Sequence, residues 1–116
     1  MKIADIVRIL DAQVLCGQDK LEEEITAAFG TDMMSDALAF MQEKTLLLTG
    51  MVNTHVIRTA EMLEVRCVVF VRGKPVSNEV LQMGEDQGMV LLATPKTLYI
   101  SCGLLYEQGL PGCTRN

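Results

Sequence analysis

The stretch VVFVRGKPVS, residues 68–77, decides the fold of this chain. An apolar run ends at Arg72-Gly73-Lys74, and Pro75 and Ser77 precede a new apolar pattern. This order predicts a buried strand, then a tight turn that exposes two cations, then a helix. The turn either grips a phosphate or is an ordinary turn with surface charges.

Three stretches of the second half share this form: TLLLTG (45–50), CVVFVRG (67–73) and MVLLATP (89–95). Each apolar run is continuous rather than alternating, which is typical of parallel strands that are covered on both faces. Amphipathic helical patterns follow the runs over residues 53–64, 77–88 and 96–109. This alternation predicts right-handed βαβ units.

The first half is less regular. KIADIVRIL (2–10) predicts a short helix, QVLCG (13–17) a short strand, and EITAAF (24–29) a second candidate strand. DMMSDALAFMQE (32–43) has an apolar stripe at helical spacing. No linker rich in Pro, Gly or Ser divides the chain. We therefore expect an α/β fold over residues 1–116 as one domain: a three-layer sandwich with a mostly parallel central sheet and helices on both faces.

Each predicted helix after the first begins near a residue that can cap its free N–H groups. Pro at a first helical position would strengthen the start of the last helix. The candidate caps are Thr31 or Asp32, Asn53 or Thr54, Ser77, and Thr94 ahead of Pro95.

Composition limits the classes of function. The chain has 116 residues, 49% of them apolar, and a formal charge of -5. Its basic residues are scattered, so no basic face is available for nucleic acid, and an acidic surface disfavours anionic membranes. Charges interrupt the N-terminal apolar residues, so no signal peptide is expected, and the apolar runs are too short to span a bilayer. A cytoplasmic protein is expected.

The four cysteines lie at positions 16, 67, 102 and 113, and no two form a C-x-x-C pair. Neither a zinc site nor a thioredoxin motif is therefore predicted. We expect reduced thiols, with no metal and no cofactor.

The order TLLLTG, amphipathic helix, CVVFVRGKP with VSNEVL, and VLLATPKT resembles the DRTGG domain. That domain is a regulatory or spacer module in some phosphotransacetylases, and lies between paired CBS domains in certain inorganic pyrophosphatases. The front half, with its segment TDMMSD (31–36), is similar to free-standing relatives described as like the N-terminal domain of HPr kinase. Arg72-Gly73-Lys74 stands where members commonly have Thr-Gly-Gly. The resemblance implies a non-catalytic regulatory module that often pairs with itself, so a homodimer is expected.

Ligands of parallel α/β sheets bind beyond the carboxyl ends of the strands. Three loops should meet there, and each opens a helix whose N-terminus suits an anion. The predicted ligand is a nucleotide or another phosphorylated metabolite. The candidate ligand-binding residues are Thr49, Gly50, Asn53, Thr54, Arg72, Gly73, Lys74, Ser77, Thr94 and Thr97, with Asp32 and Ser35 from the TDMMSD segment.

Other interpretations of these residues remain open. Every βα turn needs a cap and a bend, whether or not it binds a ligand, and the chain has neither a Walker loop nor a G-x-G-x-x-G motif. His55 is a general base or an exposed helix residue. Asp32 and Asp36 would share a helical face and either bind a cation or favour the helix N-terminus. No catalytic residue is assigned.

Three hypotheses for function follow. The first is a non-catalytic module that senses a small anionic metabolite and self-associates. The alternative is an interaction scaffold that docks on a larger enzyme without a small ligand, through adaptable methionines at positions 33, 34, 41 and 51. The third is a small enzyme that depends on His55, which the absence of a catalytic constellation disfavours.

Overall fold

The five strands form one mixed sheet in the computed structural model, which describes residues 1–42 and 44–113. Strands β2 to β5 are parallel, whereas β1 pairs antiparallel with β5 at one edge. The mostly parallel sheet predicted from the sequence is confirmed. Its spatial order is β1-β5-β4-β3-β2, and the strands are β1 (Gln13–Cys16), β2 (Ala27–Gly30), β3 (Thr45–Thr49), β4 (Cys67–Phe70) and β5 (Val90–Ala93).

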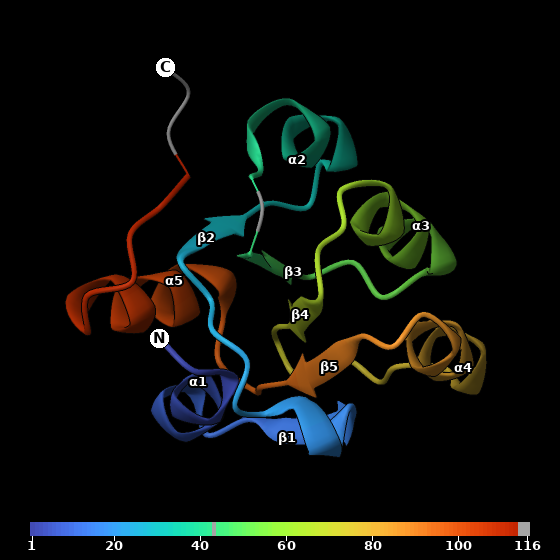
Figure 1. The fold of residues 1–116 in the computed structure, drawn as a ribbon, viewed down its shortest axis with the longest axis horizontal. Helices are drawn as coiled ribbons and strands as arrows, with labels where there is room; N and C mark the ends of the chain where they lie inside the picture. The colour runs from blue at the N-terminus through green and yellow to red at the C-terminus, as the bar shows by residue number, and fades with distance from the viewer. Residues whose placement is uncertain (43, 114–116) are drawn as a thin grey trace.

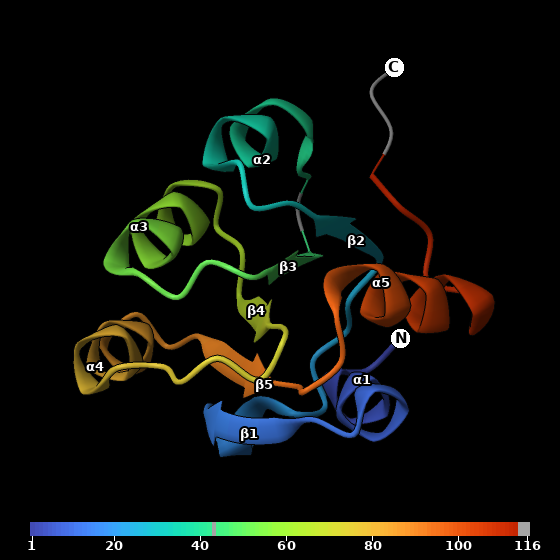
Figure 2. The same cartoon turned by 180° about the vertical axis from the view of Figure 1, so that it is seen from behind.

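The helices cover both faces of the sheet, as the sequence predicted. Figure 1 shows α2, α3 and α4 on one face and α1 and α5 on the other, and Figure 2 shows the same layers from behind. A 3-10 turn over Gln18–Lys20 follows β1. The helices are α1 (Ile3–Leu10), α2 (Met34–Phe40), α3 (Thr54–Met62), α4 (Asn78–Asp86) and α5 (Leu98–Glu107).

Alternate residues of the central strands pack into two separate cores. Leu46 and Leu48 of β3 pack in the core below α1 and α5, whereas Leu47 between them packs in the core below α2, α3 and α4. All three side chains are fully buried. Because both faces are covered, both sets of side chains are mostly apolar, and this explains the continuous apolar runs.

Two predicted helix starts differ from the structure. The pattern over residues 32–43 gives a shorter helix, α2, whose N-cap is Met33 rather than Thr31 or Asp32. Asp32 stays outside the helix because its carboxylate binds the start of the next loop, at Gly50. The predicted helix end at Glu43 lies outside the described residues.

The second difference is at α5, which begins at Leu98 with Thr97 as its N-cap. Thr94 is therefore not a cap, and Pro95 is not the first helical residue. The buried Thr94 hydroxyl donates to the Leu10 carbonyl (2.7 Å) and accepts from the Lys96 N–H. It thus ties the end of β5 to α1.

None of the helices within the described part of the chain has the length and apolar character that crossing a membrane requires.

Candidate functional site

Three loops lie together at the carboxyl ends of β3, β4 and β5, an edge that we call the rim. The chain leaves β4 toward α4 and β5 toward α5, on opposite faces of the sheet, which is where α/β proteins usually have a binding crevice. Two backbone hydrogen bonds close this crevice: Arg72 N–H donates to the Lys96 carbonyl (2.8 Å) and Gly73 N–H to the Thr94 carbonyl (3.0 Å). The polar side chains of the rim gather one strand further along, at the end of β3.

Gly50 is the centre of this group. Its N–H donates to Oδ1 of Asp32 (2.6 Å), and the Thr49 hydroxyl donates to the same oxygen (3.2 Å). The Gly50 carbonyl accepts from Nζ of Lys74 (3.0 Å) and from Nη2 of Arg72 (3.4 Å). One buried residue therefore links a carboxylate to two cations. We call these five residues the rim cluster.

The guanidinium of Arg72 lies directly against Gly50. A Cβ atom at position 50 would stand 2.5 Å from Nη2 of Arg72, so only glycine leaves room for this contact. Arg72 also has φ 67°, a left-handed conformation that costs an L-residue roughly 1–2 kcal/mol. The turn is thus strained at the residue whose side chain reaches back to the end of β3.

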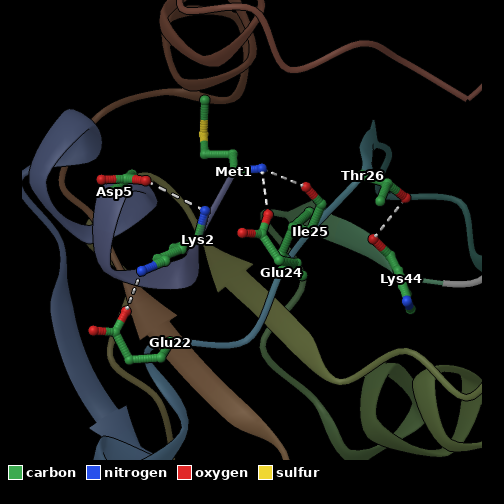
Figure 3. A network of polar contacts seen from close by, with 8 residues as sticks. All are labelled: Met1, Lys2, Asp5, Glu22, Glu24, Ile25, Thr26 and Lys44. Atoms are coloured by element: carbon green, nitrogen blue, oxygen red, sulfur yellow. Dashed lines mark hydrogen bonds and ion pairs between the residues drawn. The ribbon is translucent and has the colours of Figure 1, made fainter.

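The cations of the rim cluster lack acidic partners. Within residues 1–42 and 44–113, neither Arg72 nor Lys74 forms an ion pair. The amino-terminal edge of the sheet is different. Figure 3 shows the Met1 ammonium bound to Glu24 (3.0 Å) and Lys2 bound to Glu22 (3.4 Å). The rim cluster therefore has two cations and one carboxylate, Asp32, and a net positive charge, although the chain as a whole is acidic.

Most of the other predicted site residues cap helices or form hydrogen bonds with main-chain groups. The Asn53 side chain accepts from Val56 N–H and caps α3, and the Ser77 hydroxyl accepts from Val80 N–H and caps α4. Thr94 is bound to α1, and Thr97 is the N-cap of α5 without a side-chain hydrogen bond. These groups lie at helix starts around the rim and not in the rim cluster.

Ser35 and Thr54 make no hydrogen bond to the rim cluster among the residues that the structure describes. Asp36 lies in the first turn of α2, whereas Asp32 precedes that helix. The expectation that the two aspartates share one helical face is therefore wrong. His55 is exposed near the start of α3 and forms no hydrogen bond with the described chain.

The described residues do not meet the requirements of a metal site. The described ranges contain no group of three His, Cys, Asp or Glu side chains placed to hold an ion.

Sequence reasoning missed an apolar groove beside α5. Its volume is about 550 Å³, and it is lined by α5, the edge strand β2 and residues 110–113. Tyr99 and Tyr106 protrude beside it, with 86% and 73% of their surfaces exposed. The one available signal was the composition of α5, LYISCGLLYE, which is apolar on all sides and has a single charge at Glu107.

The last described residues cover the open edge of β2. Ala28 N–H donates to the Pro111 carbonyl (2.9 Å), and Cys113 N–H donates to the Ala28 carbonyl (3.2 Å). The backbone of the edge strand is thus paired on its outer side at Ala28.

A comparison with known protein families decides the relationship of the chain. The sequence model of the DRTGG domain matches residues 5–104, which include the whole rim cluster. The chain belongs to the DRTGG domain family. The resemblance inferred from the sequence is thereby confirmed. None of the curated proteins compared with this DRTGG domain matches it.

A solved structure has the same fold as this DRTGG domain. It is the crystal structure of the CBS and DRTGG domains of the regulatory region of Clostridium perfringens pyrophosphatase, complexed with the activator diadenosine tetraphosphate. The TM-score is 0.73 at 16% sequence identity, over 99% of this chain and 51% of that one. The chain therefore spans about half the length of that structure, and the likeness is one of fold.

Proposed function

We propose that this DRTGG domain, as one domain over residues 1–116, is a non-catalytic regulatory module that binds a small phosphorylated ligand at the rim cluster. The observation that carries the proposal is the convergence of Arg72 and Lys74 on one neutral oxygen, the Gly50 carbonyl. Two like charges beside one another repel, and a single carbonyl dipole compensates them poorly. A phosphate group offers several anionic oxygens, and Arg can bind two of them at once.

A regulatory role is supported by the family. In the similar structure, DRTGG and CBS domains form the regulatory region of a pyrophosphatase, and the activator there is a nucleotide. A catalytic role has less support, because the exposed His55 has no hydrogen-bonded partner among the described residues. General base catalysis needs such a group to be positioned by its neighbours.

Calorimetric titration with inorganic phosphate, pyrophosphate, AMP and ATP tests the proposal. We expect Arg72→Ala and Lys74→Ala each to weaken binding about tenfold to a hundredfold, because each removes a hydrogen bond from a charged donor. Arg66→Ala is the matched control, since it removes one positive charge just before β4, at the opposite edge of the sheet. Equal weakening by all three variants, or no binding by the wild type at millimolar concentrations, would exclude the rim as the site.

A second proposal is self-association through the α5 surface, defined by Tyr99, Ile100, Tyr106 and the adjacent groove. This surface carries protruding rings and a hollow side by side, and a two-fold symmetric dimer requires both on the same patch. It favours a homodimer over the scaffold that was predicted to dock through methionines. Of those methionines, Met34 is buried, and only Met33 is largely exposed.

A further inference from the structure

Asp32 is the one acidic member of the rim cluster, and its position calls for an explanation. A carboxylate beside an anion site weakens the binding of any anion by direct repulsion. The separation is small here, because Asp32 binds the N–H of Gly50 while Arg72 and Lys74 bind the carbonyl of the same residue. If bare phosphate were the ligand, this carboxylate would only lower its affinity.

The carboxylate is also only partly engaged by the protein. Its Oδ1 accepts both protein hydrogen bonds, from Gly50 N–H and the Thr49 hydroxyl. The second oxygen, Oδ2, accepts none from the described residues, and the side chain is exposed. An ionised carboxylate is an acceptor with about four lone-pair sites, so Asp32 can still bind hydroxyl groups of a ligand.

We propose that Asp32 selects a sugar phosphate, such as a nucleoside 5′-monophosphate, over inorganic phosphate. This inference rests on the proposed function and specifies which class of phosphorylated ligand the rim cluster prefers. Arg72 and Lys74 hold the phosphate, and Oδ2 of Asp32 accepts hydrogen bonds from hydroxyl groups of the sugar ring. Asp32 follows the strand next to β3, and a carboxylate at the end of a neighbouring parallel strand is a position suited to ribose hydroxyls.

The discriminating variant is Asp32→Asn. An asparagine still offers Oδ1 to the Gly50 N–H, so the rim geometry is kept while the negative charge is removed. The probes are inorganic phosphate, ribose 5-phosphate, AMP, and 2′,3′-dideoxyadenosine monophosphate, which lacks the ring hydroxyls. Asp36→Asn is the control, because it removes an exposed carboxylate that lies on α2 and outside the rim cluster.

We expect Asp32→Asn to affect ligands with sugar hydroxyls and inorganic phosphate in opposite ways. Wild-type protein should bind AMP about tenfold more tightly than the dideoxy analogue, because a hydrogen bond to a charged acceptor is lost. Asp32→Asn should reduce this preference to about threefold or less and should tighten the binding of inorganic phosphate about twofold to fivefold. Asp36→Asn should change neither quantity. Ribose 5-phosphate that binds as tightly as AMP would support the proposal and show that the sugar phosphate alone is recognised.

Two results would overturn the inference and leave the proposed function intact. One is wild-type binding of phosphate with equal affinity for AMP and the dideoxy analogue. The other is equal weakening of every probe by Asp32→Asn, which would make Asp32 only a support for the Gly50 backbone. If wild-type protein binds none of the probes, the proposed function itself fails, and the inference fails with it.

Discussion

Arg72 has a strained backbone, and the hydrogen bond that its side chain forms stabilises the fold only weakly. The left-handed backbone costs roughly 1–2 kcal/mol, whereas its bond to the Gly50 carbonyl, at 3.4 Å, is long. Folding alone would favour glycine at this position. Asp11, Lys44 and Glu64 share this left-handed conformation, and what sets Arg72 apart is that its side chain belongs to the rim cluster.

A buried thiol predicts how stability depends on pH. Burial raises the pKa of the Cys67 thiol far above its ordinary value, and the charge of Glu23 raises it further. The unfolded chain releases this proton near pH 9, whereas the folded protein keeps it. Stability should therefore fall as the pH rises above about 9. Between pH 8 and pH 10 this group alone should cost about 1.4 kcal/mol.

Urea unfolding of the wild type and Cys67→Val at pH 7, 8, 9 and 10 measures this loss. At pH 7 and 8 the thiol is neutral in both states, so the difference between the two proteins there reports packing alone. Above pH 9 the variant should lose less stability than the wild type. Parallel curves over the whole range would show that the thiol does not contribute to the pH dependence.

At the scale of elements, two helix starts depend on side chains that the sequence also offered for ligand binding. We expect Asn53→Ala and Ser77→Ala each to lower the free energy of unfolding by about 1 kcal/mol, because each removes the acceptor that caps α3 or α4. Thr97→Ala is the control, since its side chain makes no cap bond, and it should cost only a few tenths. Denaturant unfolding measures all three. A cost at position 97 equal to the others would contradict the capping assignments.

Most elements could be predicted from the sequence because local patterns determine them. Both faces of β3, β4 and β5 are covered, which leaves continuous apolar runs, and Asn53 and Ser77 precede helices that they cap. The start of α2 could not be predicted. Asp32 is a good capping residue by type, but its carboxylate binds Gly50, which is 18 positions away in the sequence. Only the folded sheet brings these two residues together.

The candidate site was predictable to a similar extent. The parallel strands predicted the rim as its place, and Arg72 and Lys74 as its cations. Periodicity does not reveal which polar side chains are already hydrogen-bonded to the main chain. Thr94 is an example, because its hydroxyl donates to the Leu10 carbonyl. Periodicity also does not reveal the groove beside α5, because the edge strand β2 completes it from a distant part of the chain.

At the scale of the whole molecule, charge is arranged unequally between the two edges of the sheet. Within the described chain, Lys2 and Arg66 at the amino-terminal edge are paired with glutamates and Lys44 is not, whereas at the rim neither Arg72 nor Lys74 is paired. A net charge of -5 repels anionic ligands at long range, and the rim offsets this only locally. The arrangement favours a small anion that can approach one edge over an extended polyanion.

The α5 surface makes a prediction for the oligomeric state. Three of the large apolar side chains that are well exposed in the described chain, Tyr99, Ile100 and Tyr106, lie on this one helix. If two copies pair through it, Tyr106→Glu should convert a dimer to a monomer, because pairing would bury two carboxylates without partners. Multi-angle light scattering measures the mass of each variant over a range of protein concentrations.

Met62→Glu is the matched control for this experiment. Met62 is 71% exposed, close to Tyr106 in exposure, but it lies at the end of α3 on the other face of the sheet. The same charge placed there should leave the dimer intact. A wild-type protein that stays monomeric at high concentration would exclude self-association, and the apolar groove would then be a surface for a different protein. Dissociation by both variants would instead place the dimer interface away from α5 or attribute the effect to added charge alone.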